Sequence, residues 1–184
     1  LGESPVTCCY DCGCPDGSYC DIPDPENPEL DSACKSESEI TMEVTGVEVP
    51  EITQCSTNYI ANITLKINNP PSGMPPAMSG QVRLNNTLYG IQCSGGPPIY
   101  SCPLALRPAV RCGVGSYDIG PNNLSLNIRY RDGPNLAVKD MAAGFSDITV
   151  TYDCACPGGY YCDAGQNICK PEAAVSLSII NLTS

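Results

Sequence analysis

Apolar and polar side chains alternate through the middle of the chain, with the two-residue period of a β-strand that has one buried face. The clearest alternation puts Tyr59, Ala61, Ile63, Leu65 and Ile67 on one face, with mostly polar residues between them. A run of this length predicts a strand whose one face lies in a core and whose other face meets solvent.

Weaker alternation recurs four times, near residues 40–49, 82–91, 124–130 and 148–152. In the first of these stretches the phase shifts by one residue at Gly46, which predicts a β-bulge. Loops rich in proline and glycine separate the stretches. Six or seven short strands in this arrangement predict an all-β fold, an immunoglobulin-like antiparallel β-sandwich. Because the chain has no tryptophan, the Cys–Trp–Cys pattern of true immunoglobulin domains is absent and only the architecture is predicted.

Helical periodicity is nearly missing from the sequence. Residues 136–143 are compatible with one or two helical turns. In the C-terminal tail, Ala173, Leu177 and Ile180 would share one face of a helix. The serines and β-branched residues of the tail favour a strand instead.

The tail beyond the last cysteine contains a candidate strand for assembly. Val175, Leu177 and Ile179 alternate with serines, and Ile180 follows them. No neighbouring strand in the sequence is available to pair with this segment. An unpaired apolar strand of this kind would be prone to associate with other chains. We expect it to join a neighbouring subunit by β-augmentation. Asn181 has the same parity as Val175, so a glycan there would conflict with a strand inserted that far.

A cysteine-rich motif occurs twice and brackets the β-rich region. Residues 11–21 read DCGCPDGSYCD and residues 153–163 read DCACPGGYYCD, with eight identities in eleven positions. Cys34 closes the first copy after an acidic loop, and Cys169 closes the second after a shorter loop. The chain is therefore expected to divide into an N-terminal cysteine-rich module (1–37), a β-sandwich (38–153), a second module (154–170) and a tail strand (171–184).

Every cysteine is expected to form a disulfide. Neighbouring Cα atoms lie about 3.8 Å apart, which is shorter than a disulfide requires. Cys8 and Cys9 therefore take different partners, and Cys12 and Cys14 likewise reach different sulfurs. The fourteen cysteines are Cys8, Cys9, Cys12, Cys14, Cys20, Cys34, Cys55, Cys93, Cys102, Cys112, Cys154, Cys156, Cys162 and Cys169.

The β-rich region contains four of these cysteines, an even set. We expect Cys93 to pair with Cys102 and close a Gly/Pro loop, and Cys55 to pair with Cys112 and tie distant strands together. Four cysteines allow three connectivities, so the spacing alone leaves the alternatives open.

Charge and composition exclude several classes of function. The net charge is −11 and the pI is near 4.2, which argues against nucleic acid or anionic membranes as partners. The nine basic residues are scattered singly. Because the chain has no histidine, it has no Ser-His-Asp or Cys-His arrangement. Its carboxylates cluster in loops as solvated surface, so we do not expect an enzyme.

The cysteine content predicts an oxidising, extracellular compartment. Four Asn-x-Ser/Thr sequons predict N-linked glycans, at Asn62, Asn85, Asn123 and Asn181. No window approaches the roughly 18 consecutive apolar residues of a membrane span. Leu1 is interpreted as the mature terminus left after signal cleavage.

Two kinds of metal site compete with disulfides and surface acidity as interpretations. Cys9 and Cys12 have zinc-like spacing, but the repeated pair is Cys-x-Cys, which favours disulfides. Aspartates recur near tight turns, but no Asp-x-Asp-x-Asp calcium loop is present. We therefore expect no metal and no cofactor. These aspartates are Asp11, Asp16, Asp21, Asp153 and Asp163.

The segments CCYDCGCPDGSYC and CACPGGYYCDAGQNIC resemble the short C-x-C-P-x-G-x-x-C modules of secreted and surface proteins of archaea. In those proteins such modules often flank immunoglobulin-like domains. The resemblance covers about 50 residues directly. It implies an extracellular location and disulfides, and it implies no reaction.

Two functions from different classes are compatible with these observations. The favoured one is a structural subunit of an extracellular filament or surface layer, polymerising head-to-tail by donating the tail strand to the next subunit. The alternative is a monomeric secreted adhesion or ligand-binding module, whose tail folds back onto its own sandwich.

Overall fold

A computed structural model describes residues 9, 13–24, 26–27 and 32–174 of the 184-residue chain. The chain forms two compact units. Unit 1 comprises Leu1–Glu48, Asn62–Leu104 and Ile119–Ile148, and unit 2 comprises Val49–Ala61, Ala105–Asp118 and Thr149–Ser184. Because this division reflects packing rather than chain order, the four segments expected from the sequence stay a prediction.

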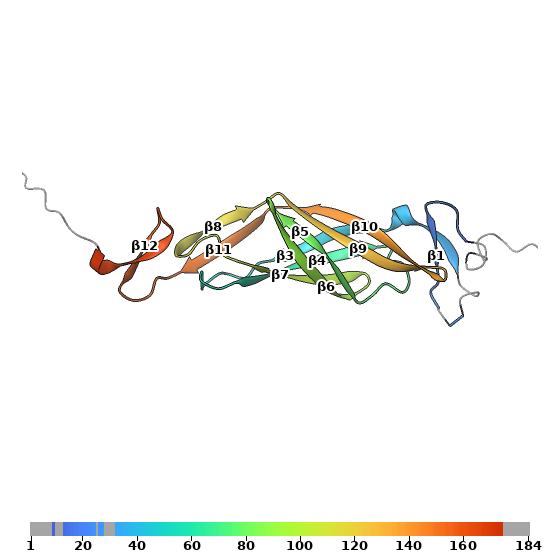
Figure 1. Cartoon of the computed structure of the whole chain (residues 1–184), viewed down its shortest axis with the longest axis horizontal. Helices are drawn as coiled ribbons and strands as arrows, with labels where there is room; N and C mark the ends of the chain where they lie inside the picture. The colour runs from blue at the N-terminus through green and yellow to red at the C-terminus, as the bar shows by residue number, and fades with distance from the viewer. Residues whose placement is uncertain (1–8, 10–12, 25, 28–31, 175–184) are drawn as a thin grey trace, which may run out of the picture. The chain divides into compact units, whose positions relative to one another are not determined.

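Strands account for most of the described residues, and the all-β prediction is confirmed (Figure 1). Two short 3₁₀ turns, η1 and η2, each follow a small hairpin. In chain order the elements are β1 (Ser18–Asp21), β2 (Ala33–Ser36), η1 (Glu37–Glu39), β3 (Thr41–Glu48), β4 (Tyr59–Asn68), β5 (Ala77–Leu84), β6 (Thr87–Gly96), β7 (Ile99–Leu106), β8 (Gly113–Ile119), β9 (Asn122–Asp132), β10 (Asn135–Phe145), β11 (Ile148–Cys154), β12 (Tyr160–Asp163), β13 (Ile168–Pro171) and η2 (Glu172–Ala174).

Unit 1 is built on one seven-stranded sheet in the order β10-β9-β5-β6-β7-β4-β3. The β9–β10, β5–β9, β5–β6, β6–β7 and β3–β4 ladders are antiparallel, as predicted. The edge strands β3 and β10 approach each other without being hydrogen-bonded neighbours, so the sheet is curled. A curled sheet encloses its own core, and the immunoglobulin-like sandwich topology stays a prediction.

The inward faces of the strands form the core of unit 1. Ile63, Leu65 and Ile67 of β4 are fully buried, and so are Leu124 and Ile128 of β9. The alternating residues between them on both strands are half-buried or exposed. The predicted inward and outward faces of these two strands are therefore confirmed.

The predicted bulge at Gly46 is also confirmed. The β3–β4 register shifts between Val44 and Gly46, so that Val44 lies opposite Leu65 and Gly46 opposite Thr64. A Cβ on Gly46 would lie 3.9 Å from the Thr64 Cβ, which places this position on the outer face. The bulge lets β3 keep apolar side chains inward on both sides of the phase shift.

The helical alternative for residues 136–143 is wrong. These residues lie in β10, which pairs with β9 from Asn135 opposite Asp132 to Phe145 opposite Asn122. The tight turn between the strands and the long antiparallel ladder satisfy the backbone, and these non-local hydrogen bonds override a weak local helical pattern.

Unit 2 holds a two-stranded β8–β11 sheet and the β12–β13 hairpin. An isolated parallel bridge joins Ile52 to β11. The Ile52 amide donates to the Thr151 carbonyl at 3.1 Å, and the Ile52 carbonyl accepts from the Asp153 amide at 2.8 Å. This bridge places the segment that carries Cys55 beside the end of β11, where Cys154 lies.

Candidate functional site

Both cysteine modules fold as the same hairpin. In module 1 (described residues 13–39) Cys20 lies opposite Cys34 across β1–β2. In module 2 (residues 153–174) Cys162 lies opposite Cys169 across β12–β13. The repeated glycine before each hairpin has a left-handed backbone, with φ of 78° in module 1 and 79° in module 2. That conformation explains why both copies keep glycine at this position.

One disulfide is common to the two modules. Cys14 bonds Cys34 in module 1, and Cys156 bonds Cys169 in module 2. In both cases the second cysteine of the Cys-x-Cys pair reaches the cysteine that closes the motif. The local cross-link ties the entry of each hairpin to its second strand and therefore holds the fold of each module.

The other disulfides correct one prediction and confirm another. Cys93 bonds Cys102 as expected, but Cys55 bonds Cys154 rather than Cys112. Cys112 bonds Cys162 of module 2. The prediction treated the four cysteines of the β-rich region as a closed set, whereas the fold brings Cys55 and Cys112 to cysteines of the second motif.

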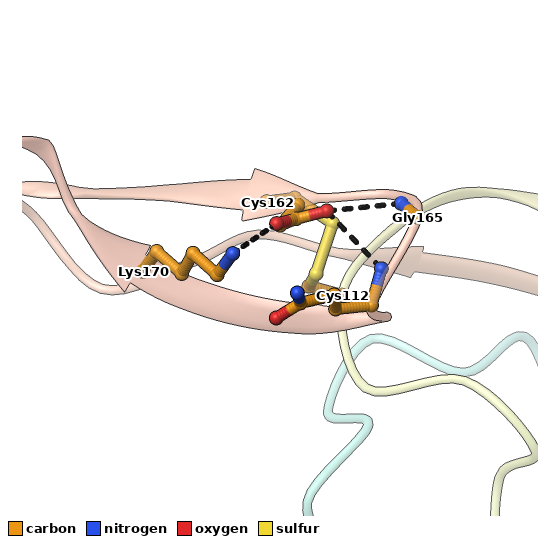
Figure 2. Close-up of polar contacts among 6 residues, drawn as sticks. Cys112, Cys162, Gly165 and Lys170 are labelled. Atoms are coloured by element: carbon orange, nitrogen blue, oxygen red, sulfur yellow. Dashed lines mark hydrogen bonds and ion pairs between the residues drawn. A yellow bond between two sulfur atoms is a disulfide. The ribbon is translucent and has the colours of Figure 1, made fainter. Parts of the chain in front are cut away.

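Each module also contains a lysine–aspartate ion pair that the sequence interpretation missed. Lys35 Nζ lies 2.5 Å from Asp21 Oδ2 in module 1. Lys170 pairs with Asp163 in module 2 (Figure 2). The signal was present as Cys-Lys-x-Glu at residues 34–37 and again at 169–172. The loop before this segment is longer in module 1 than in module 2, so an alignment of the two motifs without gaps does not superimpose the two segments.

Hydrogen bonds fix the ionised state of the module 2 pair. Asp163 Oδ1 accepts from the Gly165 amide at 3.0 Å and from the Gln166 amide at 3.1 Å. The hydrogen bond from Lys170, followed by the Gln166 amide, holds the pKa of Asp163 below its usual value. The same hydrogen bond raises the pKa of Lys170. The pair stays charged at neutral pH and closes the hairpin next to the Cys112–Cys162 disulfide (Figure 2).

The hairpin of module 1 packs against the sheet of unit 1. Tyr19 is 1% exposed and meets the Tyr130 ring edge-on, with the ring centroids 5.1 Å apart. The Cys20 amide donates to Asp132 Oδ1 at 2.7 Å, and the Cys20 carbonyl accepts from the Gly133 amide at 3.1 Å. These contacts cap the β9–β10 turn.

Two carboxylates of module 1 make further hydrogen bonds to the rest of unit 1. Glu37 Oε1 accepts from the Tyr130 hydroxyl at 2.9 Å, and Asp21 Oδ1 accepts from the Ser72 amide at 2.7 Å. The Asp21 side chain is only 1% exposed. We call Tyr19, Cys20, Asp21 and Glu37 the docking face of module 1.

The equivalent docking face of module 2 is open. Tyr161, which matches the buried Tyr19, is 37% exposed, and its neighbour Tyr160 is 44% exposed. The Asp163 side chain is 23% exposed, and Glu172 is exposed. The same module therefore occurs once with its docking face covered by a sheet and once with that face accessible.

Cysteine sulfurs gather at two places in the described part of the chain, as Cys9, Cys14 and Cys34 and as Cys112, Cys156 and Cys169. All six belong to disulfides, as do all the other described cysteines. A sulfur in a disulfide is not the thiolate that zinc binds. Of the pair with zinc-like spacing, Cys9 bonds Cys20 and is not a free thiolate, and Cys12, like Cys8, lies outside the described residues.

The three sequons within the described residues lie on outward positions. Asn62 is half-buried on β4, and its Oδ1 accepts from Ser101 Oγ at 2.7 Å. Asn85 is exposed in the β5–β6 turn, with φ of 53°, and Asn123 is exposed on β9. The fourth sequon, Asn181, lies outside the described residues.

The predicted polymerisation strand, Val175, Leu177, Ile179 and Ile180, also lies outside the described residues. Its starting point is nevertheless positioned. The β13 strand ends at Pro171, and η2 leads directly into the tail. Module 2 is fixed within unit 2 by the Cys112–Cys162 disulfide and by Asn167, which bonds the Arg111 amide at 2.8 Å.

In the described part of the chain, no helix is long and apolar enough to cross a bilayer. Comparisons with protein-family models, with curated proteins and with solved structures found no match. The resemblance to archaeal surface modules therefore stays a prediction.

Proposed function

We propose that the protein is a non-catalytic structural subunit of an extracellular, N-glycosylated filament or surface assembly, which polymerises head-to-tail by donating its C-terminal strand to a neighbouring sheet. The observation that carries this proposal is the alternating tail at the exit of a cross-linked module. Disulfides Cys112–Cys162 and Cys156–Cys169 hold module 2, so the tail leaves from a fixed point.

A rigid exit favours assembly because it lowers the entropy lost on binding. Burying Val175, Leu177 and Ile179 contributes roughly 1.5–3 kcal/mol for each side chain. Their sum is comparable to the roughly 8 kcal/mol of a micromolar contact, before association costs are subtracted. The strand alone therefore supports a weak contact, and a durable polymer needs a second contact beside it.

Repetition of one such contact yields an open fibre when the rotation between subunits does not close a ring. The disulfides and the sequons are compatible with an extracellular setting. The net charge of −11 makes like subunits repel one another, so assembly is expected to strengthen as salt screens that repulsion.

Deletion of residues 172–184 tests the proposal. The native chain should form fibres visible by negative-stain microscopy, and the shortened chain should remain monomeric in size-exclusion chromatography. A native chain that stays a sharp monomer at micromolar concentration would overturn the proposal. So would fibres that persist after the deletion.

A secreted adhesion or ligand-binding module is the second candidate function, and one recess in unit 2 favours it. Ser56, Thr57 and Asn58 line a hollow of ≈ 420 Å³ together with Arg107 and Arg111. Two arginines beside hydroxyl and amide groups suit a carboxylate or another anionic group. A native chain that stays monomeric would favour this candidate.

A further inference from the structure

The repeat extends beyond the two cysteine motifs, and the structure establishes this extension. After each hairpin the chain enters a 3₁₀ turn, η1 in module 1 and η2 in module 2. The Glu37 amide donates to the Gly17 carbonyl at 3.0 Å, and the Glu172 amide donates to the Gly159 carbonyl at 2.9 Å. Glu37 and Glu172 therefore occupy equivalent positions. The two segments that follow them can be compared residue by residue in sequence.

Module 1 leads through η1 into β3, the first strand of the unit 1 sheet. Counting onward from the paired glutamates, the tail repeats the pattern of β3. The polar residues Thr41 and Glu43 correspond to Ser176 and Ser178. Apolar residues correspond as Ile40 to Val175, Met42 to Leu177, Val44 to Ile179 and Val47 to Leu182.

The tail also repeats the phase shift of β3. In β3 the shift accompanies the bulge at Gly46, whose position faces outward beside Thr64. The residue at the Gly46 position of the tail is Asn181. A strand with this bulge points Asn181 outward, which removes the conflict between a glycan there and insertion of the tail. It also makes Ile180 the counterpart of the exposed Thr45 rather than a core residue.

The docking faces give an independent second observation. Module 1 covers the β9–β10 turn of a sheet, and β3 then pairs with β4 of the same sheet. Module 2 has the same hairpin, disulfide and ion pair, but Tyr161 is 37% exposed where Tyr19 is 1% exposed. Module 1 is followed in the chain by β3, and both pack on one sheet. Module 2 has an accessible docking face and is followed by a segment that resembles β3, in the same order.

We infer that module 2 and residues 175–183 are a second copy of module 1 and β3, and that their partner is a second copy of the unit 1 sheet. The docking face of module 2 caps the β9–β10 turn of that sheet, and the tail takes the β3 position beside β4. In this register Leu177 lies opposite the partner's Ile67, and Ile179 lies opposite the partner's Leu65. This inference names the acceptor in the proposed function, on which it rests.

In a polymer of identical chains, each sheet already holds its own module 1 and β3. Acceptance of the donated segment is then an exchange of equivalent elements, as in domain swapping. The incoming segment replaces four apolar residues of β3 with four of its own, and its docking face takes the place of that of module 1. A test is sharpest where the acceptor position starts empty.

An extended chain supplies such a position: residues 1–184 followed directly by a second copy of residues 50–174. Ser184 stands at the position of Val49, so the second sheet has every strand except β3. Only residues 153–183 are available to complete it. Amide hydrogen exchange read by mass spectrometry reports both copies of β4 in the same peptides. The expected result is one slowly exchanging population, and two equal populations, one fast and one slow, would overturn the inference.

Two matched variants of the extended chain test the register. Leu177 stands at the position of Met42, which is 9% exposed, so L177E should split the β4 peptides into two populations. The fast one should exchange at least about a hundredfold faster than the slow one. Ser178 stands at the position of Glu43, which lies 3.6 Å from Lys66 Nζ, so S178E should keep one slow population. Equal effects of the two variants would overturn the assigned register.

Nitration of tyrosine tests the docking face in the same extended chain. The first Tyr161 should be covered by the second sheet, and the second Tyr161 should remain accessible. Half of the Tyr161 sites are therefore expected to react, against all of them in the chain without residues 172–184, which is expected to stay monomeric. Complete reaction in the extended chain would contradict docking of module 2.

These outcomes are separate from those of the proposed function. Fibres of the unextended chain that require residues 172–184, together with two populations in the extended chain, would leave the proposed function standing and overturn the inference. One slow population in the extended chain without fibres of the unextended chain would do the opposite.

Discussion

Single side chains determine how module 1 is held. Tyr19 and Tyr130 meet edge-on at 5.1 Å, and the Tyr130 hydroxyl donates to Glu37. Burial, with a contribution from Asp21 and Glu39, raises the pKa of Tyr19 from 10.0 to about 12. Burial and the hydrogen bond to Glu37 also raise the pKa of Tyr130. Both rings are therefore held as neutral phenols at one junction.

This junction predicts alkaline sensitivity. Tyr19 binds its proton more tightly in the folded state, so its contribution to stability is complete below pH 10 and is lost as the pH rises to about 12. Tyr19→Phe should flatten this part of the profile, because phenylalanine fills the same space without an ionising group. Thermal unfolding as a function of pH measures the effect.

Tyr161→Phe is the matched control for this prediction, since Tyr161 is the repeat counterpart and is 37% exposed. Its profile above pH 10 should match that of the unaltered chain. An unchanged profile in Tyr19→Phe would show that the Tyr19 proton does not contribute to the alkaline transition.

At the scale of the strand, close backbone approach between β5 and β9 holds the centre of the sheet together. A Cβ added at Gly80 would lie 2.2 Å from the Ser125 carbonyl oxygen and 2.5 Å from Leu126 Cδ2. The carbonyl belongs to the neighbouring backbone, so only a shift of a whole strand would relieve the clash. Glycine at this position is therefore a requirement of packing.

Gly80→Ala should destabilise the protein by about 1–3 kcal/mol or more, since the sheet must open to accept the methyl group. Gly90→Ala is the control, because nothing lies within 4 Å of a Cβ built there. That substitution should be neutral or stabilise by up to about 1 kcal/mol through the unfolded chain. Denaturant unfolding measures both changes, and equal costs would contradict the close approach of β5 and β9.

A strand was predictable where the local pattern of apolar and polar residues indicates it, and was not predictable where it forms through pairing with another strand. Ile63, Leu65 and Ile67 alternate with polar residues, so the inward face of β4 was predictable from local sequence. β10 was not, because Leu136 and Val138 are 67% and 58% exposed and their strand exists through pairing with β9. A ladder between strands has no signature in the pattern of one of them.

At the scale of the whole molecule, the disulfides differ in how much of the chain they constrain. Cys55–Cys154 spans a sequence separation of 99, and Cys93–Cys102 spans 9. In the chain-entropy argument, loops of these sizes correspond to about 4.7 and about 2.7 kcal/mol. The longer link should therefore stabilise the fold more.

Replacing Cys55 and Cys154 by serine should lower the free energy of unfolding by about 2 kcal/mol more than replacing Cys93 and Cys102. Both changes remove one disulfide and leave the others in place, so each serves as the control for the other. Chemical denaturation measures the difference. A larger cost for the short loop would show that local packing around Cys93–Cys102 outweighs chain entropy.

The candidate site was predictable in its parts and not in its arrangement. The doubled motif, the sequons and the alternating tail could all be read from the sequence. The Asp21–Lys35 pair and the seat of Tyr19 could not, because loops of unequal length separate the repeated lysine and glutamate from the motif. The sequence carries Cys-Lys-x-Glu in both copies, and the matching hydrogen bonds to Gly17 and Gly159 established that Glu37 and Glu172 are equivalent.

The sequence by itself determined that the chain is all-β, which faces of its clearest strands are buried, and that one cysteine motif is used twice. These features arise from local periodicity and residue chemistry. Only the tertiary structure decided the order of strands in the sheet, its curl and the partners of Cys55 and Cys112, because these depend on contacts between distant segments. It also decided the difference between the two modules. The same motif is buried against a sheet at Tyr19 in module 1 and is exposed at Tyr161 in module 2.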